Sequence, residues 1–208
     1  MLRHKKGELI AVIGLDGSGK TTLARGLVRR LRAEGRRAVR VHVWPTVPRL
    51  RSAGRATGLR TEPSRLPLWR TMGFGVLALL VLRVWLPWLL RRHDVVVCDR
   101  FVHDLVTYLR LRGREGAAAW LLRAGRPLEP EAIFRLRVPL DTLVKRAGEG
   151  LEHPPSVYAR WAELYEGLIA EVPGWARRTH TLDGMQPPEA LCDEALRRLR
   201  GGRGNRVR

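Results

Sequence analysis

Residues 14–22 read GLDGSGKTT and come directly after an apolar run, LIAVI, at residues 9–13. Gly14, Gly19, Lys20 and Thr21 satisfy the spacing G-x-x-x-x-G-K-[ST]. Glycines let successive backbone N–H groups turn toward one anion, and a helix that begins here points its positive end at the same anion. The stretch therefore predicts a strand, a phosphate-binding loop and a helix. The alternative is a tight turn with an incidental lysine, which the strand–loop–helix order disfavours.

The residue types in this loop suit a nucleoside triphosphate with its metal ion. Lys20 would reach the β- and γ-phosphates, and the Thr21 hydroxyl would be a ligand of Mg²⁺. We therefore expect Mg²⁺ with ATP as the cofactor. The nucleotide-binding residues would be Gly14, Asp16, Gly17, Ser18, Gly19, Lys20, Thr21 and Thr22.

Outward from the loop, apolar runs alternate with helical patterns along the chain. Strands are expected at residues 8–13, 37–44, 94–100, 132–139 and 178–184. Helices are expected at residues 20–33, 72–90, 102–124, 140–148, 156–172 and 187–200, and residues 46–68 look like a loop with a short helix. This alternation predicts an α/β fold with a five-stranded parallel sheet and helices on both faces.

Composition sets the size of the fold and the charge of its partners. With 208 residues, 45% of them hydrophobic, the chain suits one domain over residues 1–200, followed by a basic, disordered tail at 201–208. The formal net charge of +19 indicates anionic partners, but an arginine bias spread over solvated helix faces explains it equally well. We therefore expect nucleotides as ligands and regard nucleic acid as an unlikely partner.

Cysteine usage and the N-terminus favour a cytoplasmic protein. Cys98 and Cys192 cannot form a disulfide framework and lack metal-ligand spacing, which indicates free thiols in a reducing compartment. The basic start of the chain is followed by an apolar run too short for a secretion signal.

Residues 72–90 form an apolar segment about long enough to span a bilayer. Arg83 lies near its middle, where insertion of an arginine costs roughly 2.5–3.5 kcal/mol. Pro87 would also kink a spanning helix. We favour a helix that is buried in the core or in a dimer interface, with membrane contact as the alternative.

Two motifs together resemble the thymidylate kinase family. Its members carry a loop of the form G-x-D-G-x-G-K-T-T, matched by residues 14–22, which include Asp16. They also carry D-R-[YFH] after a central strand, matched by Asp99, Arg100 and Phe101. Residues 160–165 (RWAELY) and 181–184 (TLDG) are similar to the helix after the lid and to the last strand of the family, so the resemblance covers about residues 8–200.

The resemblance implies a P-loop nucleoside monophosphate kinase fold that transfers the γ-phosphoryl group of ATP to a small phosphorylated acceptor, with dTMP as the first guess. By the same resemblance, Asp99 would lie near Mg²⁺ and the incoming phosphate, and Arg100 would bind the acceptor phosphate. Asp16 and Phe101 would lie beside the acceptor. The family also implies a homodimer and a lid, here at about residues 147–156.

The sequence departs from the family pattern in ways that leave the acceptor open. VWPTVPRL replaces the arginine-proline-glycine-glycine stretch after the second strand, and Asp104 stands where the family has serine. The lid contains no arginine, so Arg146 and Arg160 beside it are the candidates for the catalytic arginine. A kinase of a nucleoside or of another phosphorylated metabolite, a nucleic-acid 5′-kinase, and a non-catalytic ATP-binding regulator therefore remain alternatives.

Overall fold

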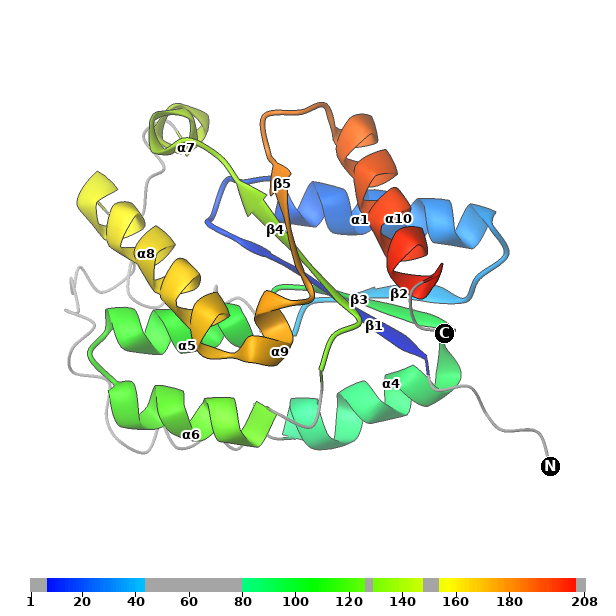
Figure 1. Ribbon diagram of the computed structural model, residues 1–208, viewed down its shortest axis with the longest axis horizontal. Coiled ribbons are helices and arrows are strands. Elements are labelled where there is room, and N and C mark those ends of the chain that lie inside the picture. The colour runs from blue at the N-terminus through cyan, green and yellow to red at the C-terminus, as the bar shows by residue number, and fades with distance from the viewer. Residues whose placement is uncertain (1–6, 44–79, 126–128, 148–153, 205–208) are drawn as a thin grey trace, which may run out of the picture.

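The computed structural model describes residues 7–43, 80–125, 129–147 and 154–204. Its five strands form one parallel sheet in the order β2-β3-β1-β4-β5 (Figure 1). The strands are β1 (Glu8–Gly14), β2 (Ala38–Val41), β3 (Val95–Asp99), β4 (Ala132–Arg137) and β5 (Thr179–Asp183). The predicted fold class, a five-stranded parallel sheet with helices, is confirmed.

Helices cover both faces of the sheet (Figure 1). One face carries α1 (Lys20–Ala33) and α10 (Pro188–Gly204). The other carries η2 (Val81–Trp85), α4 (Leu86–Arg92), α5 (Val102–Leu111), α6 (Glu115–Gly125), α8 (Pro155–Glu171) and α9 (Pro173–Ala176). A short helix, α7 (Leu140–Ala147), follows β4.

The central strand β1 shows why the sequence has a continuous apolar run here. Successive side chains of a strand point to opposite faces of the sheet. Leu9, Ala11 and Ile13 pack under α5 and α8, and Ile10 and Val12 pack under α1 and α10. Because both faces are covered, every position needs an apolar side chain, as is typical of parallel sheets.

Several predicted elements differ in the structure. The single helix expected at residues 102–124 is two helices, because Gly113 adopts a left-handed conformation (φ 67°) that ends α5. The second strand ends at Val41, and α10 continues to Gly204, into the stretch expected to be disordered. The expected loop at residues 46–68 and most of the lid lie outside the described residues.

The described part of the apolar segment at residues 72–90 is helical. It contains a short π-helix, η2, followed by the α-helix α4. Pro87 has no N–H to donate to the carbonyl of Arg83, so the regular α-helical ladder cannot continue across this turn. Within the ranges that the structure describes, no helix is long and apolar enough to cross a membrane.

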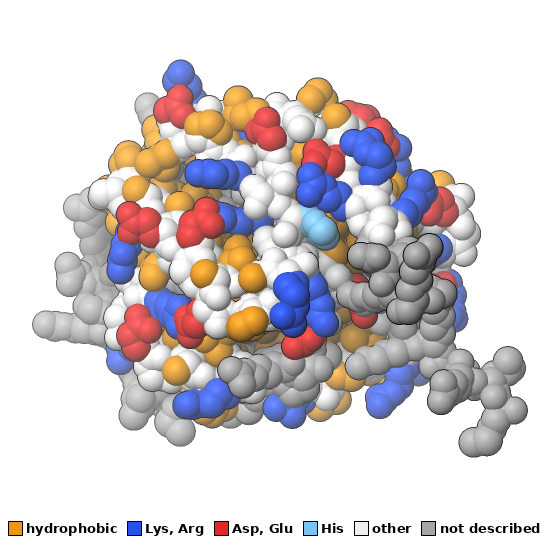
Figure 2. All heavy atoms as spheres, viewed as in Figure 1, with side chains coloured by type: hydrophobic (Ala, Val, Ile, Leu, Met, Phe, Trp, Pro, Cys, Tyr) orange, Lys and Arg blue, Asp and Glu red, His pale blue; other side chains and the backbone are white. Residues whose placement is uncertain are grey.

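Part of the surface charge is balanced by local ion pairs. Basic and acidic side chains alternate on the face seen in Figure 2. Many arginines pair with a carboxylate, for example Arg110 with Glu171 (2.7 Å) and Arg200 with Glu34 (2.7 Å). These pairs fit the interpretation of the net charge as an arginine bias on solvated helix faces.

The contact between α1 and α10 depends on a glycine. A Cβ atom on Gly26 would lie 2.3 Å from the sulfur of Cys192, which is buried. We expect Gly26→Ala to lower the free energy of unfolding by about 1–3 kcal/mol, because overpacking outweighs the better helix propensity of alanine. Thermal melts should show the loss. Gly167→Ala, at an exposed position of α8 with nothing within 4 Å, is the control and should raise the melting temperature. A Gly26→Ala protein as stable as this control would contradict the packing argument.

Candidate functional site

The loop between β1 and α1 has the backbone that the glycine pattern predicts. Gly14, Gly17 and Gly19 all have positive φ angles, of 143°, 82° and 93°. A Cβ on Gly14 would lie 2.8 Å from the carbonyl oxygen of Leu136 on β4, so a larger residue does not fit there. The loop is thus held against the neighbouring strand and ends where α1 begins, at Lys20.

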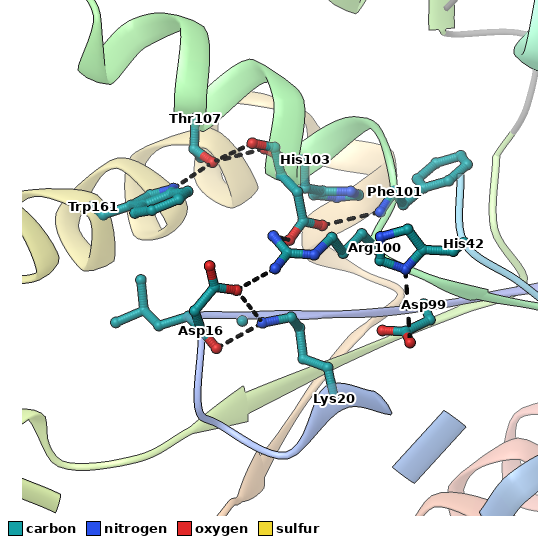
Figure 3. Close-up of polar contacts among 12 residues, drawn as sticks. Asp16, Lys20, His42, Asp99, Arg100, Phe101, His103, Thr107 and Trp161 are labelled. Carbon is teal, nitrogen blue, oxygen red and sulfur yellow. Dashed lines mark hydrogen bonds and ion pairs between the residues drawn. The ribbon is translucent and has the colours of Figure 1, made fainter. Parts of the chain in front are cut away.

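Lys20 is a buried cation inside this loop (Figure 3). Its Nζ donates to the carbonyl oxygen of Leu15 at 2.6 Å and to Asp16 Oδ1 at 3.4 Å. Burial lowers the pKa of Lys20, although Asp16 opposes the shift. An ammonium group that has lost its water and lies at a helix N-terminus is well placed for a phosphate.

Asp16 joins Lys20 to Arg100, which follows β3 (Figure 3). Arg100 Nη2 donates to the same Oδ1 atom of Asp16. Burial on its own would raise the pKa of Asp16, but Lys20 and Arg100 outweigh it, and the pKa is lowered. The structure therefore brings together three predicted site residues as one chain of alternating charge.

Asp99 lies at the carboxyl end of β3 and is 1% exposed. Arg40 Nη1 donates to its Oδ2 at 2.8 Å, and His42 Nδ1 lies 3.8 Å from the same atom. Burial alone would raise the pKa of Asp99, but interactions with His42, Thr21 and Arg40 lower it to about 2. Asp99 therefore keeps a negative charge at the edge of the sheet, beside Thr21 in the first turn of α1.

Sequence reasoning missed Arg40 and His42 as neighbours of this carboxylate. They are two residues apart, so they share one side of the second strand and its continuation. The register of β2 and β3, with Val41 opposite Cys98, brings this stretch beside Asp99. The alternation of polar and apolar residues in RVHV, at residues 40–43, indicates that Arg40 and His42 share one side of the strand. Only the pairing of β2 with β3 identifies Asp99 as their partner.

The residues fit a Mg²⁺–nucleotide complex. Ser18 Oγ and Asp99 Oδ1 are buried and find no hydrogen-bond partner among the described residues, which is costly unless a ligand supplies one. No group of three or more His, Cys, Asp or Glu in the described ranges could hold a metal ion. Mg²⁺ commonly takes one or two protein oxygens and completes its shell with phosphate and water. Asp99 and the Thr21 hydroxyl could be those oxygens.

Three predicted residues, Phe101, Arg160 and Thr22, are not part of this cluster of contacts. Phe101, expected beside the acceptor, is fully buried, and its ring belongs to the core cluster between α5 and the sheet. Arg160 is exposed on α8 and donates to Glu163 at 2.8 Å. Thr22 is exposed in the first turn of α1.

Arg146, the other candidate for the catalytic arginine, lies closer to the loop. Both of its Nη atoms are 3.4 Å from the carbonyl oxygen of Gly184, which follows β5. Gly184 itself packs against the loop, since a Cβ there would lie 3.3 Å from the Ser18 carbonyl oxygen.

Comparison with known proteins is consistent with a nucleotide-binding site. The chain is similar to thymidylate kinases. Those of two strains of Xanthomonas oryzae pv. oryzae, PXO99A and MAFF 311018, are 28% identical over 199 residues, which cover 91% of this chain and 81% of theirs. The thymidylate kinase of Rhodopirellula baltica is 28% identical over 192 residues, or 90% of this chain and 78% of its own. No family model matches the chain. The parallel sheet is consistent with the P-loop nucleotide kinase fold.

Proposed function

We propose that the protein is an ATP-dependent nucleotide kinase that transfers the γ-phosphoryl group of ATP to a nucleoside monophosphate, with dTMP as the first candidate. The observation that carries this proposal is the chain Lys20–Asp16–Arg100, in which one carboxylate holds two cations at the edge of the sheet. Lys20 would serve the donor phosphates and Arg100 the acceptor phosphate. The similarity to thymidylate kinases supports the same reaction.

The residues of the site act by positioning and by neutralising charge. Lys20 and the backbone N–H groups of the loop bind the phosphates of ATP. Thr21 and Asp99 would hold Mg²⁺, and the ion would supply positive charge beside the phosphoryl group. Arg100 exchanges Asp16 for the acceptor phosphate, because guanidinium geometry suits both anions. A nucleoside or another phosphorylated metabolite remains the alternative acceptor.

The proposal also covers the extent of the domain, the location of the protein and its oligomeric state. We propose that residues 1–200 form one domain and that the protein acts in the cytoplasm as a homodimer. Exposed apolar side chains on and beside η2 and α4 support pairing through these helices. They are Leu80, Val84, Trp85 and Trp88, with exposed fractions of 54%, 60%, 39% and 43%.

The experiment that tests the function measures ADP release by the purified protein with Mg-ATP and a panel of nucleoside monophosphates and nucleosides. Release that depends on dTMP is the expected result. Release with a different acceptor would keep the kinase and change its substrate. ATP binding without release from any acceptor would favour a second candidate, a non-catalytic ATP-binding regulator. That candidate is supported by Arg160, a candidate catalytic arginine that is exposed and pairs with Glu163.

Substitution of the two arginines that flank the lid should separate their roles. We expect Arg146→Ala to lower turnover at least about tenfold, because a cation on the migrating phosphoryl group can be worth about 10³ in rate. Arg160→Ala should have little effect, since exposed ion pairs such as the one with Glu163 contribute about 0–1 kcal/mol. ATP affinity, measured by calorimetry, should stay the same in both variants. Equal turnover in both would mean that the catalytic charge comes from another residue.

A further inference from the structure

Asp104 is a buried carboxylate that the proposed reaction does not use. It lies on the first turn of α5 and is 4% exposed. Its Oδ1 accepts the hydroxyl of Tyr165 at 2.8 Å, and its Oδ2 accepts the backbone N–H of Phe101 at 2.9 Å. Arg100 Nη1 lies 4.0 Å from Oδ1. The two hydrogen-bond donors and the guanidinium of Arg100 all favour the ionised form of this carboxylate.

Through the N–H of Phe101, Asp104 fixes the turn that carries Arg100. Arg100 has a φ of 75°, and it is the only non-glycine residue with positive φ in the described ranges. Such a conformation is unfavourable for a side chain with a Cβ and persists only where the surroundings hold it. The Arg100 N–H donates to Val12 on one side of the turn, and Asp104 holds Phe101 on the other.

Through Tyr165, Asp104 also contacts the phosphate-binding loop. Tyr165 is 1% exposed on α8, and its hydroxyl oxygen lies 3.4 Å from the carbonyl oxygen of Gly14. Gly14 is the first glycine of the loop, and α8 is the helix that follows the lid segment. One carboxylate thus connects α5, α8 and the turn after β3 beneath the loop.

Asp104 further extends the alternating charge around the loop. Lys20, Asp16 and Arg100 carry two positive charges and one negative charge, and Asp104 supplies the second negative charge. Burial raises the pKa of Asp104 above its ordinary value, and Lys20, Arg100 and the hydrogen bonds from Phe101 and Tyr165 offset only part of that rise. Without this carboxylate, Arg100 would have Asp16 as its one anionic partner among these groups.

We propose that Asp104 is a positioning residue whose carboxylate, through Phe101, Tyr165 and the Arg100 guanidinium, holds Arg100 and the first loop glycine in the geometry needed to bind the acceptor phosphate. This role rests on the proposed function, because Arg100 is its acceptor-binding residue.

Asp104→Asn is the direct test, because it keeps the size and removes the charge and one acceptor atom. Hydrogen–deuterium exchange of the free protein should show the amides of residues 14–20 and 99–101 exchanging at least about tenfold faster. Tyr165→Phe removes only the hydroxyl, and we expect a smaller change in the same segments. This second variant keeps the proposal testable if the asparagine protein does not fold.

Thr107→Val is the matched control. The Thr107 hydroxyl accepts the indole N–H of Trp161 at 2.9 Å, a second buried bond between α5 and α8. It donates to the backbone of α5 and also interacts with the Tyr165 hydroxyl, but within the described ranges it makes no hydrogen bond or ion pair with Arg100. We expect this variant to lose stability while exchange in residues 14–20 stays as in the wild type. Equal acceleration there in the two variants would reduce Asp104 to a structural residue and overturn the proposal.

Kinetics with the acceptor found in the ADP-release panel provide the second readout. Asp104→Asn should raise the acceptor KM at least about tenfold and weaken Mg-ATP binding by a smaller factor, because Lys20 still binds the donor phosphates. A lower kcat with an unchanged acceptor KM would contradict the positioning role. If the wild-type protein turns over no acceptor, the proposed function fails, and the exchange comparison still decides whether Asp104 positions Arg100 and the loop.

Discussion

Replacement of Lys20 by alanine should abolish measurable Mg-ATP binding and leave the fold intact. The Lys20 ammonium lies inside the phosphate-binding loop, and its two acceptors are Leu15 and Asp16. A hydrogen bond to a charged group contributes about 1.5–3 kcal/mol, so the loss of two phosphate contacts corresponds to at least about a hundredfold weaker affinity. Titration calorimetry with Mg-ATP measures this change directly.

The fold should survive because Lys20 contributes little to it. Burial lowers the pKa of Lys20, which means that desolvation of this charge destabilises the folded state. Asp16 keeps Arg100 as a cationic partner in the variant. Circular dichroism and thermal melts should therefore be close to those of the wild type. Lys145→Ala, which removes an exposed lysine on α7, is the control and should bind ATP normally. Unchanged ATP affinity in Lys20→Ala would remove the basis of the nucleotide site.

The part of the fold around the loop could be predicted because its signals are local. The strand expected at residues 8–13 and the helix expected at residues 20–33 are observed at Glu8–Gly14 and Lys20–Ala33. An apolar run buried on both faces, three glycines and a lysine at fixed spacing determine these elements without help from distant residues. The same holds for Asp99 and Arg100, which directly follow the apolar residues of β3.

Features that depend on distant partners could not be predicted. The contact between Arg40 and Asp99 joins residues 59 positions apart and requires β2 to lie next to β3. The bond between Tyr165 and Asp104 spans 61 positions and requires α8 to pack on α5. The D-R-F motif identified the position of Phe101, but whether its ring faces solvent or the core depends on how α5 packs. Sequence spacing alone contains none of this information.

Removal of the Arg100 side chain should weaken acceptor binding far more than ATP binding. Its guanidinium reaches Asp16 at the edge of the loop, whereas Lys20 remains in place for the donor phosphates. The loss of a charge-assisted contact to the acceptor phosphate corresponds to about 1.5–3 kcal/mol, or roughly a 10- to 150-fold higher acceptor KM. Steady-state kinetics with the acceptor from the panel, and calorimetry with Mg-ATP, give the two values.

The backbone at Arg100 calls for two variants, alanine and glycine. Alanine keeps the unfavourable φ of 75°, whereas glycine adopts it freely. Both should show the same loss of acceptor affinity, but the glycine variant should be more stable, by about 1 kcal/mol. This comparison separates the chemistry of the side chain from the strain of the turn. If the glycine variant lost ATP and acceptor affinity equally, Arg100 would support the loop as a whole, and its assignment to the acceptor phosphate would be wrong.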